Sequence, residues 1–135
     1  MNKPDFSGTW KFSASESRLQ IAPPDTAVLV IDHREPVFRI SRTHIFHGKS
    51  DTVALSLTTD GKETAGEGEG LRFRSRAFWE GETLIFESLV ERGSDTGVNT
   101  VRYRLSNSRN ALTAEERLRS TIMNYDNLWV MERQP

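Results

Sequence analysis

The sequence contains no cysteine, only three histidines and almost no net charge, and each scarcity excludes a class of protein. Without cysteine there is no disulfide framework, no thiolate metal site and no cysteine nucleophile. His33, His44 and His47 do not stand at a metal-ligand spacing, so neither a metal nor a cofactor is expected. With 18 basic against 19 acidic side chains, the chain lacks the basic excess typical of nucleic-acid binders.

Long apolar runs are also missing. No window approaches the roughly eighteen consecutive apolar residues of a membrane span. The start, Met1–Asp5, has no apolar leader segment, so the chain as written is expected in the cytoplasm. A periplasmic or secreted location is expected instead if a signal peptide preceded it. The length of 135 residues predicts a single domain over residues 1–135.

The main pattern in the sequence is an alternation of apolar and polar residues with a period of two. From Leu71 to Trp79 the odd positions are mostly apolar, whereas three of the four even positions are arginine, which is typical of a half-buried strand. Short turn signals separate similar segments. The pattern predicts about ten strands, near residues 8–13, 26–33, 37–45, 51–59, 62–67, 70–79, 83–91, 98–106, 111–122 and 128–133. Residues 14–25, which contain two prolines, are expected to form an ordered crossing loop, with room for one helical turn.

The turn residues also predict a register. A two-residue turn at Glu80-Gly81 pairs Trp79 with Glu82. A turn at Asn124–Asn127 places Arg119 opposite Glu132. Continued across the strands, this counting gives an outer row of alternating charge, Arg74, Glu87, Arg102 and Glu115. The alternation indicates a solvated, salt-bridged face; the other interpretation of the clustered arginines is a site for an anionic polymer.

Ten short strands with one apolar face remove their free edges most simply by closing into a barrel. The sequence therefore predicts an all-β protein, a closed antiparallel up-and-down β-barrel. Such a barrel either packs solid or encloses one small ligand. The apolar side chains expected inside are Leu71, Phe73, Ala77, Trp79, Leu84, Phe86, Val90, Val101, Leu105, Leu112, Leu118, Ile122, Trp129 and Met131.

Some polar residues stand at the same alternate positions as these apolar residues, so they are also expected to point into the barrel. They are Arg42, His44, Ser75, Ser88, Tyr103 and Glu116. A buried charge is costly unless it is paired, so Arg42 and Glu116 would need each other, water or a ligand. The alternative is a bulge after Phe38 that turns Arg42 toward solvent at the barrel mouth. His44 and His47 are three apart on one strand and face opposite ways, which disfavours joint metal binding.

The opening residues, Asp5-Phe6-Ser7-Gly8-Thr9-Trp10-Lys11-Phe12, resemble the first strand of the calycin superfamily, in which lipocalins and fatty-acid-binding proteins carry Gly-x-Trp. The strings at Asp60–Thr64 and Trp79–Leu84 are similar to hairpins in a group of uncharacterised bacterial lipocalin-like proteins. This resemblance implies a barrel with Trp10 at its closed end and a hydrophobic ligand inside.

Two departures limit what the resemblance implies. Ala14–Asp25 is too short for the helical lid of fatty-acid-binding proteins, and the last strand lacks their carboxylate-gripping Arg-x-Tyr pair. Arg42 is the candidate to replace that pair.

The first functional hypothesis is a protein that encloses a small hydrophobic or amphipathic ligand. Its candidate binding residues are Arg42, His44, Phe73, Trp79, Phe86, Tyr103, Glu116 and Trp129. The alternative is a solid barrel that acts as an interaction or homodimerisation module through Ile85, Leu89, Leu128 and Val130. No nucleophile elbow, phosphate loop or metalloprotease motif is present, which disfavours an enzyme. A third hypothesis, an isomerase or lyase, would use His44 and Glu116.

Overall fold

The computed structural model describes residues 3–68 and 70–135, and ten antiparallel strands account for most of them. The strands are β1 (Gly8–Phe12), β2 (Thr26–Arg34), β3 (Val37–Phe46), β4 (Lys49–Thr58), β5 (Thr64–Gly68), β6 (Leu71–Glu80), β7 (Thr83–Arg92), β8 (Asp95–Leu105), β9 (Ala111–Ser120) and β10 (Asn124–Arg133). The predicted all-β class and strand count are confirmed. In this part of the chain no helix is long and apolar enough to cross a membrane.

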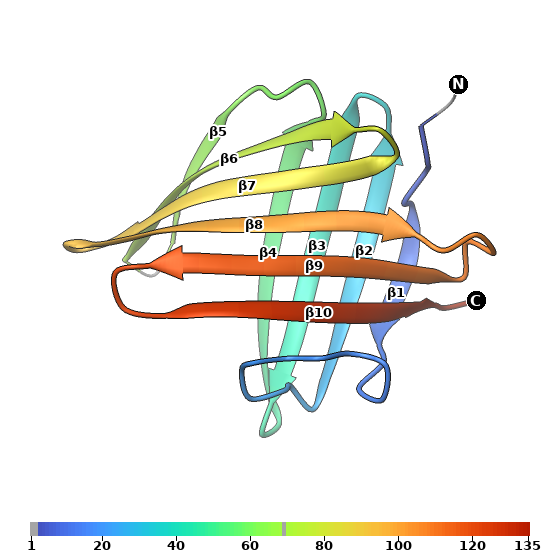
Figure 1. Ribbon diagram of the computed structural model, residues 1–135, viewed down its shortest axis with the longest axis horizontal. Coiled ribbons are helices and arrows are strands. Elements are labelled where there is room, and N and C mark those ends of the chain that lie inside the picture. The colour runs from blue at the N-terminus through green and yellow to red at the C-terminus, as the bar shows by residue number, and fades with distance from the viewer. Residues whose placement is uncertain (1–2, 69) are drawn as a thin grey trace.

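The strands form one continuous sheet, in the order β4-β3-β2-β1-β10-β9-β8-β7-β6-β5. The sheet curls so that β1–β4 lie behind β6–β10 and cross them steeply (Figure 1). Its two end strands, β4 and β5, are not hydrogen-bonded to each other, and β4 instead lies close to β6. An isolated bridge between Asp60 and Phe78 spans the join at one end. The predicted barrel is thus closed except for one lateral gap.

The residues between β1 and β2 cross one side of the barrel as the predicted ordered loop. Ser17 donates its N–H to the carbonyl of Ser13, which closes a single turn. Arg18 then pairs with Leu128 of β10, and Leu19 and Ile21 pack against the core. Residues 13–25 contain this single turn and no helix.

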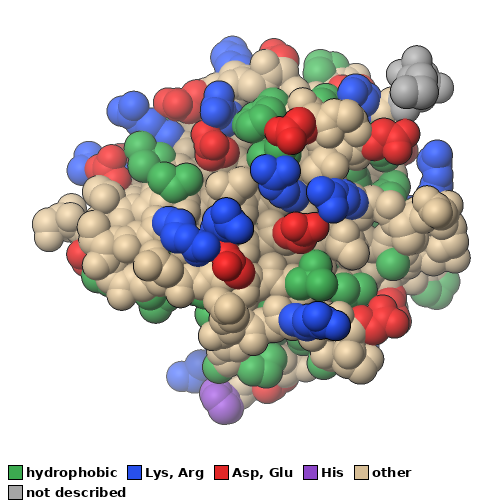
Figure 2. Space-filling view, viewed as in Figure 1, with side chains coloured by type: hydrophobic (Ala, Val, Ile, Leu, Met, Phe, Trp, Pro, Cys, Tyr) green, Lys and Arg blue, Asp and Glu red, His purple; other side chains and the backbone are tan. Residues whose placement is uncertain are grey.

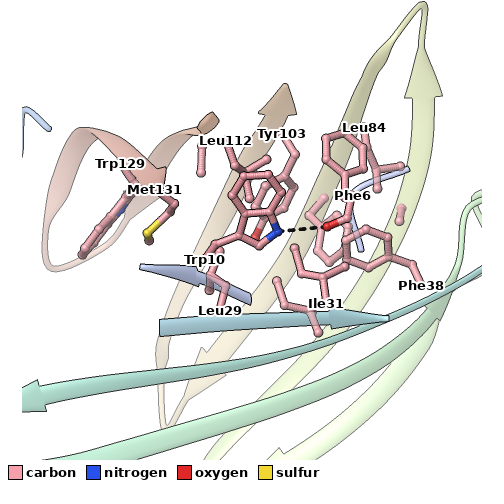
Figure 3. Packing of buried hydrophobic residues seen from close by; sticks show 14 of the residues in the cluster. Phe6, Trp10, Leu29, Ile31, Phe38, Leu84, Tyr103, Leu112, Trp129 and Met131 are labelled. Carbon is pink, nitrogen blue, oxygen red and sulfur yellow. Dashed lines mark hydrogen bonds between the residues drawn. The ribbon is translucent and has the colours of Figure 1, made fainter. Parts of the chain in front are cut away.

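The segment where the chain begins is part of the buried core (Figure 3). Phe6 and Trp10 are fully buried, and the indole N–H of Trp10 donates to the carbonyl oxygen of Phe6 at 3.0 Å. Phe6 also packs edge-on against Phe38 and Tyr103 from opposite sides of the barrel. The N-terminal segment therefore plugs one end, as expected for Trp10.

Arg133 fastens the last strand onto this plug. Its guanidinium lies 4.3 Å from the Trp10 ring centre and donates to the carbonyl oxygens of Ser7 and Arg109 at 3.0 and 2.9 Å. A Cβ on Gly8 would lie 2.7 Å from Nη1 of Arg133, and Gly8 has φ of 142°. Only glycine fits this place and this backbone conformation without strain.

The predicted register between β6 and β7 is wrong by two residues. The turn is Gly81-Glu82, so Glu80 pairs with Thr83, Trp79 with Leu84 and Arg76 with Glu87. A shift of two leaves every side chain on its predicted face, because strand side chains alternate with period two.

The predicted last turn is also wrong. The turn comprises residues 121–123, and Asn124 to Asn127 belong to β10, so Arg119 pairs with Asn124 and Glu132 with Ala111. Ile122, expected inside, is 68% exposed as a result.

Opposite charges do alternate on the outer face of β6–β10 (Figure 2). Across β6–β8 the partners differ from the predicted row, because the β6–β7 and β7–β8 registers are each shifted by two residues. Arg102 does lie opposite Glu115, as predicted. The ion pairs are Arg76–Glu87, Arg102–Glu80 and Arg104–Glu115, with Arg117 and Arg119 both paired to Asp126. The solvated, salt-bridged face is therefore confirmed for these strands.

The outer apolar patch expected for an interaction module is smaller than predicted. Ile85 is 2% exposed and Val130 is 8% exposed. The crossing loop contacts Val130, whose backbone N–H donates to Oγ of Ser17 at 2.8 Å. Ile85 lies in a cross-strand row between Phe78 and Arg102. Leu89, at 41% exposure, and the half-buried Leu128 remain of that patch.

The variant Arg133→Ala tests the fastening of β10 to the plug. It removes the stacked cation and both hydrogen bonds to carbonyl oxygens, so we expect a loss of about 2–3 kcal/mol in the free energy of unfolding, measured by urea denaturation. Arg34→Ala is the control, because Arg34 is exposed and pairs only with Asp32 on its own strand; its loss should stay below about 0.5 kcal/mol. Equal losses in the two variants would contradict the assignment.

Candidate functional site

Five of the eight predicted site residues surround one interior cavity of ≈ 30 Å³. They are Arg42 and His44 from β3, Tyr103 from β8, Glu116 from β9 and Trp129 from β10. The rest of the wall consists of Leu29, Val101, Ala114 and Met131. The strand β3 pairs without interruption with β2 and β4 from Val37 to Thr43 and beyond, so the alternative with a bulge after Phe38 is wrong.

Glu116 is the best-held polar group of this site. One carboxylate oxygen accepts hydrogen bonds from Nε1 of Trp129 at 2.9 Å and Nδ2 of Asn127 at 3.1 Å, and the other accepts from Nδ2 of Asn99 at 3.2 Å. Glu116 therefore fixes the orientation of the Trp129 indole without an arginine partner.

Arg42 lies on the same inner surface but is held differently. It is half-buried, and within residues 3–68 and 70–135 it forms no ion pair and donates no side-chain hydrogen bond. Its charge acts on its neighbours, since it lowers the pKa of His44 and opposes the rise in the pKa of Tyr103. The five N–H donors of the guanidinium are thus available to a group in the lumen.

His44 is an uncharged member of the site at neutral pH. Its ring stacks on Trp129 with centres 5.2 Å apart. Burial first and the charge of Arg42 second lower its pKa to about 4, against the opposing effect of Glu116 and Asp51. Neutral imidazole offers one donor and one acceptor.

Tyr103 closes the cavity toward the core. Burial raises the pKa of Tyr103 to about 12, so its hydroxyl stays protonated. Phe86 lies behind it, edge-on to Tyr103 at 5.1 Å and to Phe38 at 5.1 Å. Phe86 is therefore a core residue next to the cavity and is not part of its wall.

The remaining two predicted residues lie elsewhere. Trp79 is at the plugged end, where it stacks on Phe6 with centres 6.0 Å apart. Phe73 of β6 lies directly under Gly66 of β5, where an added Cβ would come within 2.5 Å of Phe73 Cζ. Gly66 is thus required by close packing inside the strand β5.

Two asparagines of the site were not predicted. Asn99 has the same parity as Tyr103 on β8, so its inward position follows from the alternation. Asn127 was assigned to a turn on its residue type. It is in fact buried, and its Oδ1 accepts the N–H of Gln20 from the crossing loop at 2.8 Å.

A second polar cluster lies at the plugged end. The buried His33 ring has Nε2 at 2.7 Å from Glu35 Oε1, and its Nδ1 accepts the N–H of Phe6. Glu35 also accepts from Thr59 and from Nε1 of Trp79. Burial raises the pKa of Glu35, but these hydrogen bonds outweigh it and hold that pKa below its ordinary value. Since Thr59 follows β4 and Trp79 lies on β6, this cluster ties the two sides of the gap together.

The described residues include no group of three or more potential metal ligands. His47 lies in the turn after β3, with φ of 51°, three residues from His44.

No protein-family model and no curated protein sequence matches this chain. Solved structures match it over almost its whole length. Secretory abundant heat soluble protein 4 from Ramazzottius varieornatus has a TM-score of 0.65 at 13% identity, covering 100% of this chain and 98% of that chain. Human cRBP IV, a cellular retinol-binding protein, has a TM-score of 0.62 at 14% identity, covering 97% and 99%.

Zebrafish ileal bile acid-binding protein, solved with cholic acid, has a TM-score of 0.60 at 14% identity, covering 96% and 98%. At these identities the likeness concerns the fold. The chain has the fold of these fatty-acid-binding-like barrels, which confirms the fold that the resemblance of the segment around Trp10 implied.

The electrostatics of the site can be tested by titrating His44 with NMR, and we expect a pKa of about 4. The folded state then takes up this proton less readily than the unfolded chain, whose histidine pKa is about 6.5. The contribution of His44 to the free energy of unfolding is therefore complete above a pH of about 6.5, and it declines as the pH falls toward about 4.

Arg42→Met should raise the pKa of His44, because it removes a repelling charge, and Glu116→Gln should lower it further. Arg39→Met is the control, because Arg39 is exposed and lies on the outer face of β3, opposite Asp32 in the β2–β3 register. A His44 pKa at or above 6.5, or the same shift with Arg39→Met, would disprove this arrangement.

Proposed function

We propose that the protein binds a small, largely hydrophobic ligand in the barrel lumen and that Arg42 orients the polar end of that ligand. The observation that carries the proposal is the inward guanidinium, which lies beside an aromatic wall and has no ion-pair partner among the described residues. An interior charge without a partner is costly, and a ligand with an acceptor group would offset that cost. Matching barrels include a retinol-binding protein and a bile acid-binding protein with cholic acid.

The size of the cavity limits how such a ligand would be held. A volume of ≈ 30 Å³ accommodates a few atoms, whereas sites for whole drug-sized molecules span roughly 300–1,000 Å³. The cavity thus suits a polar end group, and the apolar remainder would lie toward the open end. Val53, which faces the same side as Arg42 in the register, is 37% exposed there and offers an apolar surface.

Each polar residue then has a separate role. Arg42 donates hydrogen bonds to the ligand, and Glu116 holds the Trp129 ring as a wall. Asn99 keeps a buried Oδ1 without a partner among the described residues, so this oxygen is the acceptor for a ligand O–H or N–H.

Native mass spectrometry of protein purified from cells, followed by titration with 8-anilinonaphthalene-1-sulfonate, tests this function. We expect a copurified ligand or fluorescence enhancement by the probe. Arg42→Met should weaken binding of the anionic probe by about tenfold or more, because a charged hydrogen bond contributes roughly 1.5–3 kcal/mol. Arg39→Met, on the outer face of the same strand, should leave binding unchanged. Absence of both copurified ligand and probe binding would reject the proposal.

The small cavity favours one other function, that of a solid barrel acting through its surface. Leu89 is the exposed member of the patch first considered for it. Sedimentation velocity separates the two functions, because a dimer that Leu89→Glu dissociates would support the surface function.

A further inference from the structure

The turn between β9 and β10 carries two of the most exposed large apolar side chains of the described residues. Ile122 is 68% exposed and Met123 is 52% exposed. They are adjacent at the tip of a hairpin, where they project from the sheet and do not cover a core. Single exposed apolar residues are common on proteins, but a pair at a projecting tip is a potential contact.

The backbone N–H groups of this tip are hydrogen-bonded within the chain. The N–H groups of Ile122 and Met123 both approach Oγ of Ser120, at 3.3 and 2.9 Å, and that hydroxyl donates to the carbonyl of Met123 at 2.6 Å. Ser120 donates its own N–H to Oδ1 of Asn124 at 3.0 Å, and Thr121 donates to the carbonyl of Thr96 at 3.0 Å. The N–H groups of this turn and the carbonyl of Met123 are therefore paired within the chain, which lowers the cost of moving the turn from water into lipid.

The tip lies at the open end of the barrel. It is at the opposite end of β10 from Arg133, whose side chain fastens the plug (Figure 1). Leu89 and Val98, both 41% exposed, pair with each other on the outer face nearby, and Val98 also pairs with Arg119. Apolar exposure is thus concentrated at one end of β7–β10.

The charges near the tip leave a cationic excess. Arg117 and Arg119 share the single carboxylate of Asp126, at 3.3 and 3.0 Å. Arg92, exposed at the end of β7, forms no ion pair within residues 3–68 and 70–135. Asp95 also lies close, and it accepts a hydrogen bond from the Thr121 hydroxyl. Arginine binds phosphate groups through paired N–H donors.

We propose that this tip docks on the surface of a lipid bilayer, with Ile122 and Met123 among the acyl chains and Arg92 at the headgroup phosphates. A second copy of the chain fits the patch less well. A stable dimer buries about 800 Å² per partner, from roughly 20–30 residues, whereas the exposed apolar surface here consists of four side chains. A bilayer needs a small apolar insertion and a few cations. The docking site is separate from the lumen, so it does not depend on the proposed ligand.

The absence of native cysteine permits a direct test. Met123→Cys, labelled with an environment-sensitive nitrobenzoxadiazole group, is mixed with vesicles of phosphatidylcholine and phosphatidylserine. We expect a blue shift and a rise in emission. Val30→Cys, at a position 51% exposed on β2, is the matched control and should show neither change.

Vesicle cosedimentation of unlabelled protein gives the second measurement. The double variant Ile122→Ser/Met123→Ser should lose binding by about tenfold or more, because two apolar side chains no longer leave water. Val30→Ser should bind like the parent, and Arg92→Gln should reduce binding only when phosphatidylserine is present or salt is low. Thermal unfolding verifies that each variant is folded. No binding by the parent, equal loss with Val30→Ser, or a dimer that the double variant dissociates would each overturn the proposal.

Discussion

The contact between the Trp10 indole and the Arg133 guanidinium joins the two ends of the chain, and the barrel depends on that junction. β1 is only five residues long, and its register with β10 comprises three residue pairs. Such a short ladder stabilises little by itself. The cation stacked on the ring and the two hydrogen bonds to carbonyls compensate for this, and they hold the plug of Phe6 and Trp10 against strands from both sides of the barrel.

The sequence predicted which face of the sheet each side chain occupies better than it predicted which residues lie opposite each other on neighbouring strands. The side-chain alternation reports only which face a residue occupies, so Arg42, Tyr103 and Glu116 were correctly placed inside even though the pairing of β6 with β7 was wrong by two residues. The β9–β10 turn was misplaced because the asparagines of residues 124–127 have turn propensity. Tertiary contacts override it: Asn127 binds Glu116 and the crossing loop, which keeps this segment in a strand.

The sequence predicted most of the residues that line the candidate site, but it did not predict the contacts among them. The sequence left three partners open for the inward Arg42 and Glu116, namely each other, water or a ligand. The structure satisfies Glu116 with neutral N–H donors and leaves the guanidinium to the lumen. That division depends on Asn99 and Asn127, and on side-chain packing that sets a cavity of ≈ 30 Å³. Neither follows from the alternation of residues along single strands.

The lateral gap has a consequence for the behaviour of the protein at high concentration. Among the described residues β4 and β5 are the sheet's two free edges, and free edges invite pairing with other chains. Here the edges lie on opposite sides of one gap, which the Glu35 cluster holds together at the plugged end. The start of β4 is rich in charged and hydroxyl side chains, and β5 contains glycines, which favour strand growth poorly. The chain thereby resists edge-to-edge aggregation without a fully hydrogen-bonded barrel.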